Sequence, residues 1–218
     1  MFIGHAAVGL ASKRFAPTVS LGTLLAAPFF LDVLWPLFVL AGREWFRIDR
    51  GNTAVTHIDF MHYPLSHSLV TALGWSLLFG AVYFAFRRDG RAAMILGIGV
   101  ASHWLFDYVT HRPDLPLYPG GPKVGLGLWN SLPGTLIVEL ALYATGIALY
   151  LRATRARDRV GAIAFWSLVV TLLVIYLANV MTPPPTGADP KMIAVSALLI
   201  PLFFVWGAWA DRHREARG

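Results

Sequence analysis

The chain lacks cysteine altogether and contains few charged residues. With no Cys among its 218 residues, neither a disulfide framework nor a metal site built on thiolates is possible. Charged residues make up only 14% of the chain and hydrophobic residues 56%, with a mean hydropathy of +0.59. This composition excludes an ordinary soluble domain and is typical of an integral membrane protein.

The positive charge is arranged in a way that argues against a nucleic-acid partner. The formal net charge is +6 at pH 7. The basic residues stand in short clusters between apolar runs, which is the pattern that sets the topology of membrane proteins. We therefore expect an integral membrane protein with no nucleic-acid partner.

Apolar stretches of about 20 residues, long enough to cross a bilayer as helices, recur along the chain. They cover residues 18–41, 64–86, 92–111, 132–151, 160–181 and 192–210. A shorter amphipathic piece at residues 2–15 precedes them, and we interpret it as a half-helix or an interfacial helix. Without an internal repeat or a second domain, the sequence predicts one integral membrane domain over residues 1–218. The expected fold is an all-α, polytopic membrane helical bundle.

The connections between these spans differ in positive charge. The chain before the first span, the second and fourth connections and the C-terminal segment together hold twelve Lys and Arg, against six on the opposite side. The positive-inside rule then puts both termini in the cytoplasm and the longer loops, 42–63 and 112–131, outside. We expect the Pro- and Gly-rich loop 112–131 to fold over the mouth of the bundle as a lid.

A stripe of ionisable residues lies inside an otherwise apolar segment. His103, Asp107 and His111 are spaced four residues apart, which puts them within an arc of about 80° on one face of a helix. A carboxylate buried between imidazoles is costly in a low-dielectric setting unless something compensates it. A bound metal cation is the most economical compensation.

The predicted topology brings further ionisable residues to the depth of this stripe. Asp32 in the first span, His67 in the second and Glu139 in the fourth all fall in the outer half of the membrane. Intramembrane acids normally face the bundle interior, and facing helices are the usual source of ligands for a metal site in a bundle. With nitrogen and oxygen donors and no sulfur, Zn²⁺ is the leading candidate, while Mn²⁺, Fe²⁺ and Mg²⁺ remain open.

A second cluster of polar residues precedes and begins the second span. His62 and His67 flank Ser66, so one imidazole from the loop and one from the helix can address the same cavity, and Ser66 can orient ligands or donate to a phosphate. Just upstream, His57 and Asp59 form a carboxylate–imidazole pair that can orient ligands or act as acid and base.

The position of His5 depends on how the first segment is placed. On a surface helix His5 would lie far from the other ionisable residues. On a half-helix rising from Lys13, eight residues lift His5 by about 12 Å, which leaves a gap of about 10 Å to the depth of Asp32.

These residues resemble the pattern of the YdjM-like family of inner-membrane proteins, regarded as metal-dependent hydrolases. The early His of that pattern is similar to His5, H-Y-P-L-S-H-S matches with His62 and His67, and S-H-W-L-F-D matches with His103 and Asp107. A fourth element, Pro-Asp-x-Asp, is degraded here and keeps only Asp32. The match covers roughly residues 1–115.

The resemblance implies a location and a ligand set. The location is the bacterial inner membrane. The implied ligands for one or two divalent metals are His5, Asp32, His62, His67, His103 and Asp107. The missing Asp leaves the number of ions open, and His57 or Asp59 could supply the missing ligand. The ligand types are similar to those of zinc-dependent phospholipase C, which implies a phosphoester substrate.

The sequence as a whole predicts a membrane-embedded metal-dependent hydrolase acting on a phosphoester or lipid-linked substrate near the outer membrane face. Glu139 or Asp59 would take the proton of a metal-bound water, and His111 or His57 would donate a proton to the leaving group. Two alternatives remain: a metal or proton transporter, and a non-catalytic structural subunit of a membrane complex. A membrane di-iron oxygenase fits less well, because its H-x-x-H-H boxes are absent.

Overall fold

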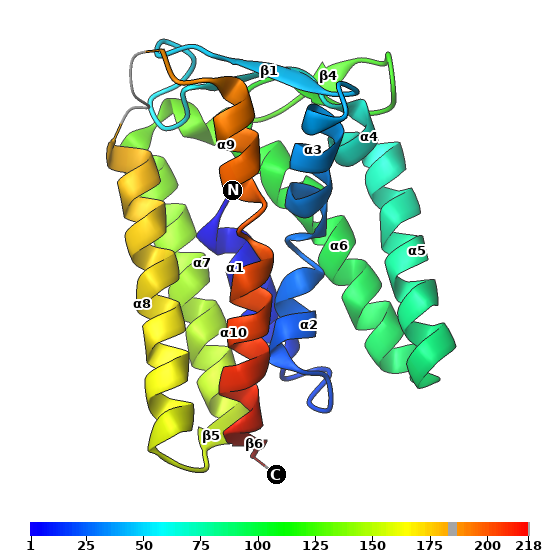
Figure 1. Ribbon diagram of the computed structural model, residues 1–218, viewed down its shortest axis with the longest axis vertical. Helices are drawn as coiled ribbons and strands as arrows, with labels where there is room; N and C mark the ends of the chain where they lie inside the picture. Colours follow the sequence, from blue (N-terminus) through cyan, green and yellow to red (C-terminus); the bar gives the residue numbers. More distant parts are fainter. Residues whose placement is uncertain (183–186, 218) are drawn as a thin grey trace.

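The computed structural model describes residues 1–182 and 187–217 and is mainly helical, with a few short strands (Figure 1). The predicted all-α, polytopic membrane bundle is confirmed. The helices are α1 (Ile3–Ser12), α2 (Leu21–Ala26), α3 (Phe30–Leu40), α4 (Pro64–His67), α5 (Leu69–Arg87), α6 (Gly90–Thr110), α7 (Leu132–Ala153), α8 (Arg159–Met181), α9 (Pro190–Ala197) and α10 (Pro201–Arg212).

Within the described residues, five helical segments are long and apolar enough to cross a membrane. They are α5, α6, α7, α8 and the combined α9–α10 segment, Pro190–Arg212. The predicted span 18–41 differs, because it is not one continuous helix: α2 has six residues and α3 eleven. Pro28 lies in the break between them and has no backbone N–H to continue the hydrogen-bond ladder of α2.

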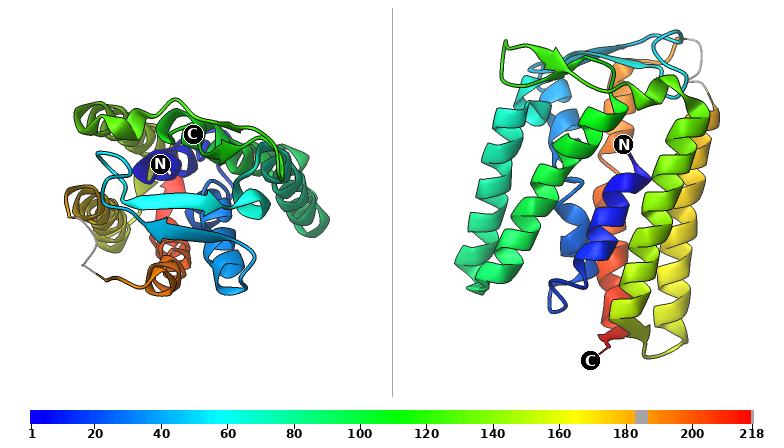
Figure 2. Two further views of the ribbon diagram at one scale, coloured as in Figure 1. Left: turned by 90° about the horizontal axis from the view of Figure 1, so that it is seen from above. Right: turned by 180° about the vertical axis from the view of Figure 1, so that it is seen from behind.

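Helix α1 is a half-helix that rises into the bundle, as one of the two interpretations of residues 2–15 predicted. It runs between α7 and α6, with its C-terminal end near the basic end of the molecule (Figure 2). Met1 therefore lies inside the bundle, where its α-amino nitrogen is 2.6 Å from Asp107 Oδ1. The C-terminal end lies at the basic end of the molecule, whereas Met1 lies within the bundle (Figure 1). The placement of both termini in the cytoplasm stays a prediction.

The two ends of the bundle are closed by different structures. At one end the antiparallel strands β1 (Trp45–Ile48) and β2 (Ile58–His62) cross the helices, beside the short pair β3 (Leu115–Pro116) and β4 (Lys123–Val124) (Figure 1). At the other end β5 (Thr154–Ala156) pairs with β6 (Arg214–Ala216). The connections rich in Lys and Arg gather at the β5–β6 end, in agreement with the alternation read from the sequence (Figure 1).

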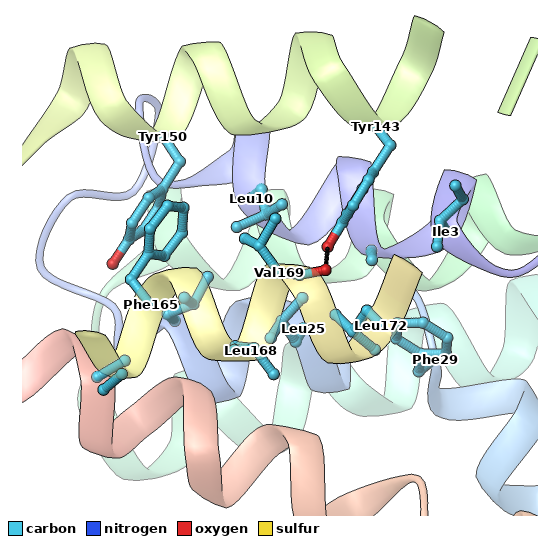
Figure 3. Packing of buried hydrophobic residues seen from close by; sticks show 14 of the residues in the cluster. Ile3, Leu10, Leu25, Phe29, Tyr143, Tyr150, Phe165, Leu168, Val169 and Leu172 are labelled. Atoms are coloured by element: carbon cyan, nitrogen blue, oxygen red, sulfur yellow. Dashed lines mark hydrogen bonds between the residues drawn. The ribbon is translucent and has the colours of Figure 1, made fainter. Parts of the chain in front are cut away.

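The core of the basic half is formed by apolar side chains from α1, α2, α7, α8 and α10 (Figure 3). Tyr143 and Tyr150 reach across from α7 to α8. The hydroxyl of Tyr143 donates to the Val169 carbonyl at 3.0 Å, and the ring of Tyr150 stacks on Phe165 with 4.7 Å between centroids. This packing holds α7 and α8 together and gives α1 a rigid wall.

We predict that Gly146→Ala will loosen the attachment of α1. A Cβ at position 146 would lie 2.6 Å from both Cα and O of Ala7, so α1 must shift away from α7. Overpacking of this kind costs about 1–3 kcal/mol of unfolding free energy. Denaturant titration of the detergent-solubilised protein measures the loss.

Gly74→Ala is the matched control, because a Cβ at position 74 meets no atom within 4 Å. It should be neutral or slightly stabilising, since Ala favours the helix more than Gly does. Equal unfolding free energies for the two variants would contradict the close contact between α1 and α7.

Candidate metal centre

Five ionisable side chains from four helices meet in the interior of the bundle. His5 comes from α1, Asp32 from α3, His67 from α4, and His103 with Asp107 from α6. They form two overlapping groups, His5–His103–Asp107 and Asp32–His67–His103, and within each group the ligand atoms lie within 4.8 Å of one another. His103 belongs to both groups. We call these five residues the central cluster.

The Nε2 atoms and carboxylate oxygens of the two groups converge on either side of the His103 ring. Nε2 of His103 lies 3.1 Å from Nε2 of His67 and 3.0 Å from Asp107 Oδ2. Asp32 Oδ1 is 3.7 Å from Nε2 of both histidines. His5 lies on the other side, with Nε2 3.1 Å from Asp107 Oδ1 and its ring stacked on that of His103 at 3.9 Å.

The break between α2 and α3 explains how the cluster closes. A straight helix over residues 18–41 left His5 and Asp32 at different depths. The break at Ala27–Phe29 instead restarts the helix two residues before Asp32 and exposes the Pro28 carbonyl, which accepts a hydrogen bond from His103 Nδ1 at 2.7 Å. Non-helical backbone at this depth is tolerated where it is buried in protein and its polar groups find partners.

The outer hydrogen bonds of His67 and His103 determine which ring nitrogen carries the proton. The Pro28 carbonyl can only accept, so Nδ1 of His103 must be protonated. Ser66 Oγ donates to Glu44 Oε2 at 2.6 Å and therefore accepts from Nδ1 of His67 at 2.7 Å. In the neutral imidazoles both Nε2 atoms then carry lone pairs, which face each other at 3.1 Å.

Two facing lone pairs, with carboxylate oxygens beside them, repel each other unless a cation lies among them. Asp107 already has one positively charged partner, because its Oδ1 pairs with the α-ammonium group of Met1 at 2.6 Å. His5 supplies a further unused donor or acceptor: its Nδ1 is buried and has no hydrogen-bond partner in the described part of the chain. The donor set, three imidazoles and two carboxylates, suits Zn²⁺ and the other divalent transition ions.

Glu44 belongs to the site although the sequence analysis missed it. It lies between α3 and β1 and is buried, and its Oε1 accepts the backbone N–H groups of Leu65 and Ser66 at 2.8 Å each. Together with its bond from Ser66 Oγ, these contacts hold the start of α4 and orient His67 from behind. Nothing in the local sequence marks Glu44, since it follows Arg43 in a polar loop and its partners lie more than twenty residues away.

His111 joins the cluster from the end of α6. Its Nε2 lies 3.7 Å from Asp107 Oδ2, and its Nδ1 lies 2.9 Å from Asp114 Oδ1, which also accepts from the hydroxyl of Tyr63 at 3.0 Å. Burial by itself raises the pKa of Asp114, but the hydrogen bonds from His111, Tyr63 and Arg112 lower it below its ordinary value. Burial and the nearby Asp114 charge raise the pKa of Tyr63, so its phenol remains a donor.

Glu139 is buried on α7 at the start of α1. Its Oε2 accepts the backbone N–H groups of Phe2 at 2.9 Å and Gly4 at 3.2 Å, where a helix N-terminus favours a carboxylate. It lines the same cavity as Asp107. Glu139 thus anchors α1 and presents a carboxylate to the space beside the cluster.

Three other predicted site residues lie elsewhere. His62 on β2 stacks its ring on Trp45, with 4.2 Å between centroids, which corrects its expected role as a ligand in the central cluster. His57 Nδ1 bonds to the Arg50 carbonyl at 3.0 Å in an exposed turn. Asp59 pairs with the guanidinium groups of Arg47 and Arg112. These residues lie on or next to β2, and the β1–β2 pair crosses the end of the bundle rather than entering it, so their side chains do not join the central cluster.

A cavity of about 650 Å³ adjoins the cluster. Asp32, His67, Asp107 and Glu139 form its polar part, beside His111 and Trp129. Its roof is formed by Val55, Thr56, Ile58 and Phe60 of the β1–β2 hairpin, which crosses the bundle when viewed from above (Figure 2). The cluster therefore faces a roofed cavity large enough for part of a substrate.

Comparison with known proteins gives a family. A family model described as YdjM inner membrane protein matches residues 1–182. No curated protein and no solved structure matches the chain.

We predict that Glu44→Ala will destabilise the protein by about 2–3 kcal/mol, because two buried amides and the Ser66 hydroxyl lose a charged acceptor. Glu215→Ala is the control, because Glu215 is also a hydrogen-bond acceptor, but its donor is Arg155 in an exposed ion pair worth less than about 1 kcal/mol. Unfolding titrations compare the two. A similar small loss in both variants would refute the structural role of Glu44.

Proposed function

This chain belongs to the YdjM family of inner membrane proteins, and on that premise we propose that it is a membrane-embedded metal-dependent hydrolase. Its substrate is a phosphoester or lipid-linked molecule that reaches the site near the outer membrane face. The single observation that carries the proposal is the close approach of the Nε2 atoms of His67 and His103, which lie 3.1 Å apart beside two carboxylates. Such an arrangement is stable when a cation occupies the space between the donors.

The central cluster would hold the metal. His5, Asp32, His67, His103 and Asp107 offer nitrogen and oxygen donors, for which Zn²⁺ is the leading candidate and Mn²⁺, Fe²⁺ and Mg²⁺ are alternatives. His103 can serve one ion only, because its Nδ1 is committed to the Pro28 carbonyl. The hydrogen bonds from Pro28, Ser66 and Glu44 would hold the ligands in place, as outer partners do in metal sites generally.

The residues around the cluster have the chemistry for hydrolysis. A bound divalent cation supplies Lewis acidity and makes a hydroxide accessible near neutral pH. Glu139 is placed to accept a proton from the attacking water, whose oxygen forms a bond to phosphorus. His111, oriented by Asp114, is placed to protonate the leaving oxygen as the original P–O bond breaks. Asp59 and His57 are less suited to these roles, because Asp59 is neutralised by two arginines and His57 lies in an exposed turn.

Two other functions use the same cluster. A proton shared between the Nε2 atoms of His67 and His103 would suit a metal or proton transporter. Below the cluster, however, the described core of the basic half is apolar until the Lys13–Asp211 ion pair, which gives no continuous polar path. A structural subunit of a membrane complex would retain the fold without bound metal or turnover.

Removing a central ligand should remove the metal. We expect His103→Ala and Asp107→Ala to lower the metal-to-protein ratio to background in plasma mass spectrometry of detergent-purified protein, because each contributes to the shared centre. His213→Ala is the control, since His213 pairs with Asp158 at the opposite end of the molecule. His62→Ala should likewise retain metal. Unchanged metal content in both cluster variants would overturn the proposed site.

The role of Glu139 can be tested separately from metal binding. Glu139→Gln keeps an oxygen to accept from Phe2 and Gly4 but cannot take a proton from water. We expect kcat for hydrolysis of a phosphoester to fall about 100- to 10,000-fold, while metal content and the unfolding transition remain close to wild type. Asp59→Asn provides the comparison and should lose far less activity. A Glu139→Gln variant with full activity would exclude Glu139 as the base.

A further inference from the structure

We propose that the cavity beside the central cluster is a binding site for a membrane phospholipid, which enters sideways from the bilayer between α8 and the junction of α9 with α10. This deepens the proposed function and rests on it for the reaction, but the lipid site itself is independent of turnover. The hydrocarbon chain would lie among the side chains of α8, α9 and α10, and the phosphate would lie at the cluster.

The lining of the cavity fits an amphiphile better than a water-soluble phosphate. The acids and His67 occupy one part, whereas Ile175, Val180, Ile193, Ile200 and Phe203 form an apolar wall. None of the described residues that line the cavity is Lys or Arg. Lys and Arg side chains commonly bind small phosphates that carry several charges. A cavity without them and with a large apolar wall favours a ligand with a single anionic group on a long apolar body.

The cavity reaches the lateral surface of the bundle. Leu199 and Leu202 line it, yet they are 58% and 60% exposed. Asn179 on α8 and Ser196 on α9 also combine a place in the lining with an exposed side chain. Residues that belong both to the cavity and to the outer surface mark the opening, or mouth, of the cavity, which therefore lies between α8 and the α9–α10 junction. Figure 1 shows where these helices run.

The junction between α9 and α10 shapes this mouth. Helix α9 ends at Ala197 and α10 begins at Pro201. The three residues between them keep their amides bonded in tight turns: Leu198 to Val195, Leu199 to Ser196 and Ile200 to Ala197, each at 3.1 Å. The backbone can therefore bend inside a membrane without exposing an unpaired N–H to lipid.

Two polar groups in the cavity wall have no protein partner. Tyr176 and Trp35 line the cavity from α8 and α3, and the Tyr176 hydroxyl and Trp35 Nε1 are buried without a hydrogen bond in the described part of the chain. Burying such donors unpaired costs about 1–3 kcal/mol each. Neither atom reaches the cavity surface in this arrangement, so phosphate or ester oxygens of a bound lipid would pair with these donors after the Trp35 or Tyr176 side chain rotates toward the cavity.

Photocrosslinking tests the site directly. The protein is reconstituted in phosphatidylcholine vesicles containing phosphatidylglycerol with a photoactivatable diazirine in its head group, which the proposal places beside the cluster, and adducts are mapped by mass spectrometry. We expect adducts on Trp35 or Val55, which line the cavity and are only 7% and 6% exposed. Adducts confined to outward-facing residues such as Val205 would overturn the proposal.

Three variants test the route of access. Leu199→Trp and Leu202→Trp narrow the mouth, whereas Val205→Trp places similar bulk on α10 at a side chain that is 68% exposed and does not line the cavity. We expect the mouth variants to lower labelling of Trp35 and Val55 by about tenfold or more, and Val205→Trp to leave it unchanged. Labelling of outward-facing residues reports folding in every variant. Equal inner labelling in all three variants would exclude this mouth.

The experiments distinguish the proposal of a lipid site from the proposal of a metal-dependent hydrolase. Inner labelling that persists in His103→Ala, with no metal found in the wild type, would keep the lipid site and overturn the metal-dependent function. Metal-dependent hydrolysis of a soluble phosphoester without inner labelling would keep the enzyme and overturn the lipid site.

Discussion

The arrangement of the bundle follows from the need to compensate a group of imidazoles and carboxylates buried in its interior. Nε2 atoms of His67 and His103 face each other at 3.1 Å, with Asp107 and Asp32 beside them, and a buried group of this kind is costly in an apolar interior unless its charges and hydrogen-bonding groups find partners. The Pro28 carbonyl, Ser66 and Glu44 supply those outer bonds. The interruption of the helix at Pro28 is what makes one of these outer hydrogen bonds possible, because it frees the Pro28 carbonyl.

Irregular backbone is concentrated around the cluster and its cavity. Helix α1 begins beside Asp107, α2 and α3 are interrupted at Pro28, and α9 and α10 are separated by a short turn next to the cavity. Broken helices within a membrane are tolerated where they line a cavity or are buried in protein, and their freed carbonyls and amides then serve as ligands or orienting groups. The long helices α5 to α8 carry no such interruption and form the frame around the site.

The two ends of the molecule use their polar residues differently. At the basic end, Lys13 pairs with Asp211 at 2.6 Å, Tyr150 donates to the same carboxylate, and Arg214 lies over the rings of Tyr150 and Phe165. These contacts fasten α1, α7 and α10 together. At the capped end the charges of Asp59, Arg112 and Asp114 tie the strand pairs to the end of α6, which leaves the cluster beneath a closed roof. The ion pairs at the basic end hold the half-helix α1 in place, and the strand pairs at the other end cover the central cluster.

The sequence by itself determined the class of protein, the positions of most helices and the stripe on α6. Hydropathy and the four-residue spacing of His103, Asp107 and His111 are local properties, and an α-helix turns them into a bundle and a common face without further information. Only the tertiary structure decided which other residues join that face. The half-helix α1 places His5 at the cluster, and the break at Pro28 places Asp32 there. Glu44 contacts the site from a loop, whereas His62 lies on a strand and stacks on Trp45. Each of those outcomes depends on contacts between residues far apart in the chain, and such contacts leave no periodic pattern in the sequence.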